Sequence, residues 1–148
     1  YVENHPELLR VEPRVGLVLI QLNHSVAPLD NIYVRRALAK SIDRKLIVGS
    51  VLKDGKKLAP RIAPSEVLDR SDDSDPLGYN PKQAQEFLHL AGFPDGSGFP
   101  RLQFAINTSV AYQALAEVVQ FGWKENLGIE VEIVNQEWKA LFKCGGIG

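Results

Sequence analysis

The chain has 148 residues, of which 45% are hydrophobic, and this is enough for one ordinary domain with a buried core. Its 17 Lys and Arg residues nearly balance 18 Asp and Glu residues, for a formal net charge of -1. Such a balance does not favour binding to nucleic acid or to an acidic membrane surface, and no apolar run approaches the ~20 residues of a membrane-spanning helix.

The beginning of the chain carries few structural signals. Tyr1 is not followed by the basic and apolar segments of a signal peptide, so we interpret the chain as a processed form or a fragment. Residues 1–14 are polar and interrupted by prolines, which predicts a loosely held lead-in. Cys144 is the single cysteine, so no internal disulfide can form and the redox compartment is left open.

A strand and a helix are predicted next. Residues 15–23, VGLVLIQLN, are nearly continuously apolar, which indicates a strand covered on both faces. Pro28 precedes a helix whose first turn Asp30 or Asn31 can cap. Its apolar stripe consists of Val34, Ala37, Leu38 and Ile42.

A shorter helix and a long polar segment follow. Asp43 is positioned to cap a helix that extends through Leu52 and ends at Gly55. Residues 56–79 are rich in proline and acidic side chains, which predicts a solvated surface loop. The segment lacks the glycine and the terminal glutamate of an EF-hand calcium loop.

The clearest helix signal starts at Asn80, a predicted N-cap, with Pro81 in the first helical position. Its stripe consists of Ala84, Phe87, Leu88 and Ala91. Gly92 is expected to end the helix in a left-handed conformation, followed by a β-turn at 94–96. This glycine-rich loop follows a helix and precedes a strand, which is the reverse of the order in phosphate-binding loops, so we interpret it as a turn.

The last third predicts a strand, a helix and a strand. The strands cover 102–107 and 129–135, and the helix between them begins at Thr108 or Ser109 as N-cap and ends before Gly128. We expect an α/β fold in which these two strands, joined by a right-handed parallel crossover, share one sheet with the first strand. The side chains expected to be buried are Val34, Leu38, Ile42, Phe87, Leu88, Leu115 and Val119. The final residues, 143–148, lose all pattern.

Three ordered blocks of the sequence resemble one protein family. They are LNHSVAPLDNIYVRRALAKSIDRKLIVGSVL, YNPKQAQEFLHLAGFPDGSGFP and NTSVAYQALAEVVQFGWKENLGIEVEIVNQEW. Together they are similar to the second lobe of the extracellular solute-binding proteins of peptide and nickel ABC importers, the oligopeptide- and dipeptide-binding group. The resemblance extends roughly from Leu17 to Leu141.

The resemblance implies a fold and a function. The fold is a lobe of a type II periplasmic-binding-protein-like structure, a central sheet flanked by helices, with residues 1–148 forming a single lobe. The function is capture of periplasmic or extracellular oligopeptides for a membrane permease, without cofactor, metal or nucleic acid. Family members are several times longer, and this chain ends in FKCGGIG where they continue. An artificial boundary or a truncated reading frame would explain that ending.

The resemblance also offers five residues of the ligand cleft, which are Asn107, Thr108, Tyr112, Gln136 and Trp138. Asn107 and Thr108 stand where a strand gives way to a helix, whose amide groups could favour a peptide carboxylate. Simple helix capping is the competing interpretation for both residues. Tyr112 and Trp138 could instead be packing residues, and Trp123 is expected in the core.

Catalytic motifs are weakly represented. The sequence contains no His-Glu-x-x-His, Gly-x-Ser-x-Gly or Cys-x-x-Cys pattern, and Cys144 has no evident activating base. We therefore expect a binding module and not an enzyme. The alternatives are a truncated domain that binds no ligand of its own, with self-association or another protein-interaction role, and more remotely a small hydrolase or transferase. Half a cleft predicts weak peptide binding by this chain alone, and an exposed cleft edge favours self-association.

Overall fold

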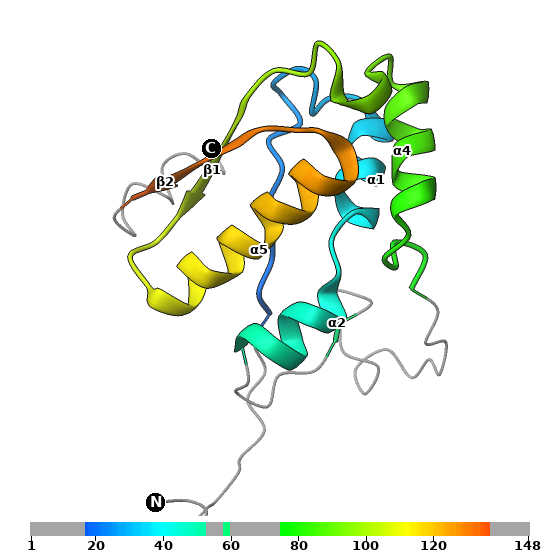
Figure 1. Ribbon diagram of the computed structural model, residues 1–148. Coiled ribbons are helices and arrows are strands. Elements are labelled where there is room, and N and C mark those ends of the chain that lie inside the picture. Colours follow the sequence, from blue (N-terminus) through cyan, green and yellow to red (C-terminus); the bar gives the residue numbers. More distant parts are fainter. Residues whose placement is uncertain (1–16, 53–57, 60–74, 137–148) are drawn as a thin grey trace, which may run out of the picture.

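A strand–helix–strand unit forms the sheet of the computed structural model, which describes residues 17–52, 58–59 and 75–136 (Figure 1). Strand β1 (Leu102–Ile106) and strand β2 (Val131–Asn135) pair in parallel, with Leu102 opposite Val131 and Ile106 opposite Asn135. Helix α5 (Val110–Leu127) connects them and packs on the sheet, where the Phe104 ring lies 5.8 Å from that of Trp123. The parallel pairing predicted for these strands is confirmed.

The strand predicted near residue 17 is wrong. Residues 17–23 are extended but pair with neither β1 nor β2, and the described sheet has two strands. Leu17, Val18 and Leu19 are 40%, 36% and 55% exposed, so this segment is not covered on both faces. An apolar run becomes a strand only where a sheet edge pairs with it, and here only Ile20 and Leu22 pack against the core.

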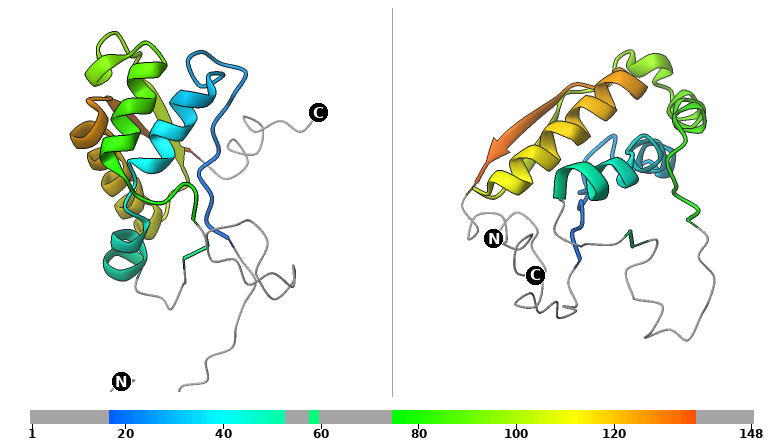
Figure 2. Two further views of the ribbon diagram at one scale, coloured as in Figure 1. Left: turned by 90° about the vertical axis from the view of Figure 1, so that its right-hand side faces the viewer. Right: turned by 60° about the horizontal axis from the view of Figure 1, so that its bottom comes forward.

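Two helices lie side by side on the other side of the molecule (Figures 1 and 2). Helix α1 (Ile32–Lys40) is capped by Asn31, whose side chain accepts from the Tyr33 amide, so Asn31 and not Asp30 is the cap. Helix α4 (Pro81–Leu90) is capped by Asn80, which accepts from the Gln83 amide as predicted. The Asn80 amide donates to the Lys40 carbonyl at 2.8 Å, which joins the start of α4 to the end of α1.

Helix α2 (Arg44–Leu46) begins at the predicted cap Asp43, whose carboxylate accepts from the Leu46 amide. It continues as the π-helix η2 (Ile47–Leu52), which the sequence pattern does not reveal. Arg44 pairs with Asp75 at 3.1 Å and also donates to the Leu77 carbonyl. These contacts fasten the segment that leads into α4 against α2.

The core lies between α1, α4, α5 and the sheet. Six of the seven predicted core side chains are buried, at 8% exposure or less. The prediction for Phe87 is wrong, because this ring is half-buried between the helices, stacked 6.2 Å from Tyr33 and covered by Arg36. The buried cluster includes Val34, Ala37, Leu38, Ile42, Ala84, Leu88, Leu115, Val119, Trp123, Leu127, Ile129 and Val131.

Hydrogen bonds join the end of α1 to α5. The Trp123 indole is 3% exposed, as predicted for a core residue, and donates to the Leu38 carbonyl at 3.0 Å. The Asn126 amide donates to the carbonyl of fully buried Ser41 at 2.9 Å. Gly122 lies at this contact, where a Cβ would stand 3.3 Å from the Ser41 carbonyl oxygen. The two helices are therefore held in one register.

Two turns are in close contact: the loop between α4 and β1, and the turn at the end of α5. The loop turns through the 3-10 segment η3 (Pro94–Gly96), and helix α5 ends at Gly128. Gly96 and Gly128 both have positive φ, and a Cβ on Gly96 would lie 2.5 Å from the Leu127 carbonyl oxygen. Phe93 and Phe99 pack edge-to-face at 5.0 Å and contact the core, which confirms that this loop is a turn fixed by its phenylalanines.

The expected division of the chain into one lobe with a lead-in at 1–14 and a tail at 143–148 stays a prediction, because both end segments lie outside the described residues. Among the described helices, none combines the length and apolarity needed to cross a bilayer.

Candidate functional site: the carboxyl edge of the sheet

Both strands end at the same edge of the sheet, and α5 begins there. Asn107 directly follows β1 and Gln136 directly follows β2. The Gln136 amide donates to the Ile106 carbonyl at 2.8 Å, which extends the strand pairing by one step. Because parallel strands carry residues of equal register to the same position, Asn107 and Gln136 are neighbours at this edge.

The side chains of these two residues share an unusual property. Asn107 Oδ1 and Gln136 Oε1 are both buried, and the described part of the chain supplies neither with a hydrogen-bond donor. A buried polar atom without a partner is costly, at about 1–3 kcal/mol. Two such atoms on neighbouring residues call for an explanation, and this makes the carboxyl edge the candidate site.

Of the two residues predicted as the N-cap of α5, Thr108 and Ser109, the structure places Ser109 there. Ser109 occupies the N-cap position of α5, but its side chain makes no capping hydrogen bond within this part of the chain. The Thr108 hydroxyl donates instead to Asn135 Oδ1 at 3.2 Å. Since the first turn of α5 also has no acidic side chain, the positive end of the helix is not neutralised locally.

Of the two remaining predicted site residues, Tyr112 is described by the structure and Trp138 is not. Tyr112 lies in the first turn of α5 and is partly exposed, within the same edge. Trp138 lies outside the described residues. Asn135 was missed by the sequence analysis, although a polar residue at the last position of an otherwise apolar strand end could have indicated it.

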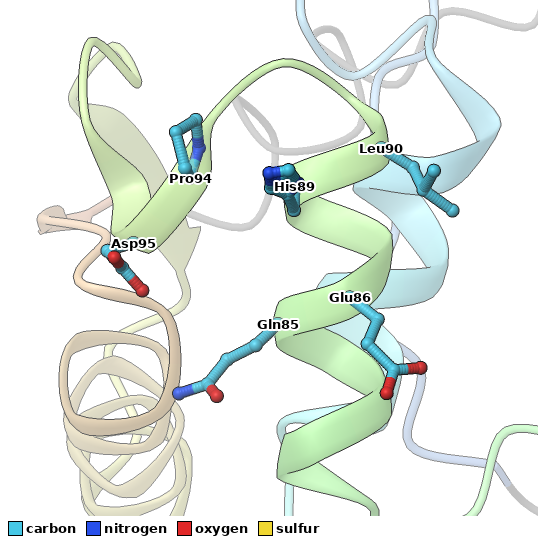
Figure 3. A pocket seen from close by; sticks show the side chains of 6 residues that line it. All are labelled: Gln85, Glu86, His89, Leu90, Pro94 and Asp95. Carbon is cyan, nitrogen blue, oxygen red and sulfur yellow. The ribbon is translucent and has the colours of Figure 1, made fainter.

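No alternative catalytic or metal centre emerges elsewhere in the described ranges. They hold no group of three or more His, Cys, Asp or Glu side chains suited to a metal ion. A shallow depression between α4 and η3 is lined by Gln85, Glu86, His89, Leu90, Pro94 and Asp95. Figure 3 shows that Glu86 and Leu90 point to one side of α4, while Gln85 and His89 point to the other. These side chains do not converge on one point, as a catalytic group would require.

Comparison with known proteins identifies the family. Residues 2–144 match the model for bacterial extracellular solute-binding proteins, family 5, middle region. The chain belongs to this family. Among curated family 5 proteins, it is 34% identical to the oligopeptide-binding protein OppA of Bacillus subtilis over 138 residues, which cover 88% of this chain and 25% of OppA. It is 32% identical to the periplasmic murein peptide-binding protein MppA of Escherichia coli, over 97% of this chain and 27% of MppA.

Solved family 5 structures share the fold. The oligopeptide-binding protein OppAIV of Borrelia burgdorferi superposes with a TM-score of 0.71 at 39% identity, covering 80% of this chain and 24% of that protein. The murein tripeptide-binding protein MppA of Escherichia coli superposes with a TM-score of 0.72 at 33% identity, covering 82% and 25%. The chain thus has the α/β fold of a type II periplasmic binding protein and spans about a quarter of the length of these relatives.

Proposed function

We propose that this chain is part of the ligand-binding lobe of an oligopeptide receptor for an ABC importer, and that the carboxyl edge of its sheet contacts the peptide. Relatives named for binding oligopeptides and murein peptides support the substrate class. On this proposal the whole protein captures peptides in the periplasm or outside the cell, delivers them to a membrane permease and performs no catalysis.

The two unpartnered oxygens at the edge carry the proposal. An extended peptide presents main-chain N–H groups, and amide oxygens such as Asn107 Oδ1 and Gln136 Oε1 accept from such groups. Because both oxygens are buried in the free chain, this proposal requires the two side chains to turn outward when a peptide binds. The uncompensated start of α5 favours a carboxylate nearby, by about 0.3–1 kcal/mol. Tyr112 provides an aromatic wall in the first turn of that helix, and Trp138 is proposed as a second one.

Thr108 has a supporting role in this proposal. Its hydroxyl bonds to Asn135 and so ties the β1–α5 connection to the end of β2. This bond spans the two strand ends beside Asn107 and Gln136. We therefore assign Thr108 to positioning the edge, and Asn107 and Gln136 to direct contact with the peptide.

Binding by this chain alone is expected to be weak. One lobe surrounds only part of a ligand, and ordering a flexible peptide costs several kcal/mol. We expect millimolar affinity or worse, about -4 kcal/mol. Isothermal calorimetry with a mixed pool of di- to pentapeptides measures this directly, and micromolar binding would contradict the half-cleft argument.

NMR can locate the residues that contact a peptide even when the peptide binds weakly. In an NMR titration with the same pool, amide shifts should concentrate at Asn107, Tyr112 and Gln136. Asn107→Ala should remove most of these shifts, whereas His89→Ala, an exposed change on α4, should leave them unaltered. Shifts confined to other elements would refute the assignment of the edge.

Self-association is a second proposal for the same edge. Val110, at the start of α5, is 89% exposed. Apolar side chains left in water at an edge favour contact with another apolar surface. Sedimentation of the wild type and of Val110→Ser tests this, since the substitution should shift any dimer toward monomer.

A further inference from the structure

The outer face of the α1–α4 helix pair lies on the side of the molecule away from the carboxyl edge of the sheet (Figures 1 and 2). We call it the α1–α4 face, and we propose that it binds a protein partner that presents carboxylate groups beside apolar side chains. Its defining residues are Ile32, Tyr33, Arg36, Lys40, Phe87 and Leu90. This inference does not depend on the proposed peptide site.

Three apolar side chains of the α1–α4 face are exposed. Ile32 is 46%, Tyr33 39% and Leu90 65% exposed. Tyr33 and Phe87 stack with their ring centroids 6.2 Å apart and form a rigid aromatic floor between the helices. In Figure 3, Leu90 extends from α4 toward the side on which α1 lies. Exposed aromatic and aliphatic groups gathered in this way are typical of protein interfaces.

The charged part of the face is basic. Helix α1 contains three basic side chains and no acidic one in the sequence IYVRRALAK. Arg35 is engaged locally, because it donates to the Leu29 and Asp30 carbonyls, both at 2.8 Å. Arg36 is different, since its guanidinium lies 5.8 Å from the centre of the Phe87 ring and is exposed. Lys40 follows one turn later on the same ridge.

Within the described residues, neither Arg36 nor Lys40 has a carboxylate partner. The ion pair in these ranges joins Arg44 to Asp75. The Arg36 guanidinium lies within cation–π range of the Phe87 ring, and a guanidinium can bind a carboxylate through two parallel hydrogen bonds. An arginine held on an aromatic ring beside exposed apolar groups has the composition of an interface hot spot.

The charge of the α1–α4 face indicates which kind of partner binds there. Helix α4 adds exposed Lys82 and Glu86 to the outer side, so basic groups outnumber acidic ones there. A second copy of the chain would place two basic surfaces against each other, which opposes a symmetric contact. An anionic lipid surface attracts clusters of many basic residues. Three cations beside one acid, in a chain of net charge -1, do not form such a cluster. An acidic protein surface is the occupant that fits.

A defined probe tests this inference on the whole chain. The probe is a fluorescein-labelled peptide with the repeat Glu-Leu-Glu-Phe, with a Lys-Leu-Lys-Phe peptide as its counterpart. We expect the acidic peptide to bind more tightly, and Arg36→Glu to weaken it about tenfold. Lys124→Glu makes the same change of charge on exposed α5 and should have no effect. Leu90→Ser should weaken binding while Phe121→Ser does not, although both side chains are 65% exposed.

The location of binding separates this inference from the peptide site. Amide shifts caused by the acidic probe should fall on α1 and α4 and should persist in Asn107→Ala. The inference is overturned if the probe does not bind, if its shifts fall on the start of α5 and vanish in Asn107→Ala, or if Arg36→Glu leaves the affinity unchanged. It is equally overturned if only phosphatidylserine vesicles bind in an Arg36-dependent manner. Circular dichroism of each variant confirms that it is folded.

Discussion

The crossing of the two glycine turns gives the sharpest test of the fold. Gly96 and Gly98 are six and eight residues after the end of helix α4 at Leu90, in the same loop, and both have positive φ, of 76° and 72°. Adding a methyl group to either therefore forces alanine into the left-handed region. The surroundings differ, because a Cβ on Gly96 would lie 2.5 Å from the Leu127 carbonyl oxygen and 2.8 Å from that of Gly128, whereas a Cβ on Gly98 would meet nothing within 4 Å.

The expected losses follow from this difference. Alanine in the left-handed conformation destabilises the folded state by about 1–2 kcal/mol. Replacing glycine by alanine also lowers the conformational entropy of the unfolded chain, which stabilises the protein by about 0.4–1 kcal/mol. Gly98→Ala should therefore cost about 1 kcal/mol. Gly96→Ala must also push apart two backbone segments that have no flexible side chain to yield, which adds about 1–3 kcal/mol, as in overpacked cores.

Urea and thermal denaturation followed by circular dichroism measure the two losses. The difference of about 2 kcal/mol corresponds to a Tm that is roughly 4–8 °C lower in Gly96→Ala than in Gly98→Ala. Equal losses in the two variants would show that backbone conformation alone governs both positions. The close approach of η3 to the end of α5 would then be incorrect.

Three further substitutions test the core and the caps, each by urea denaturation. Leu38→Ala removes a side chain that is 1% exposed and should lower the free energy of unfolding by about 2–5 kcal/mol. Leu90→Ala changes a side chain that is 65% exposed and should alter it by no more than about 0.5 kcal/mol. Similar losses in the two variants would contradict the placement of α1. Asn126→Ala leaves the buried Ser41 carbonyl without its donor and should cost about 1–3 kcal/mol; a neutral result would mean that this bond does not form. Asn80→Ala removes the cap of α4 and should cost about 1 kcal/mol, while Asn80→Gly should lose less.

Local signals in the sequence were sufficient for helix α4. Asn80, Pro81 and Gly92 each act within one turn of their own position, so the limits of α4 could be predicted without knowledge of the rest of the chain. The segment 17–23 could not, because a strand depends on a partner edge that the sequence of the segment does not specify. The π-helical course of 47–52 likewise has no signature in the residue pattern.

The candidate site also has features that the sequence could predict and features that it could not. That Asn107 and Gln136 meet at one edge follows from two parallel strands of matched register, and those strands could be predicted. The partner of Thr108 could not, since its hydroxyl can cap α5 or reach Asn135, and only the tertiary arrangement decides between them. The crossing of Gly96 with Gly128 is also a long-range contact and lies beyond any local pattern.

The parallel pairing of β1 with β2 also has a kinetic consequence. The connection between the two strands contains the 18-residue helix α5, so no tight turn can bring them together. Because loop closure opposes their contact, we expect α5 to form and dock before the two strands pair. A truncation in the buried face of α5, such as Val119→Ala, should slow refolding. Ile133→Ala in β2, which forms its contacts later, should mainly accelerate unfolding.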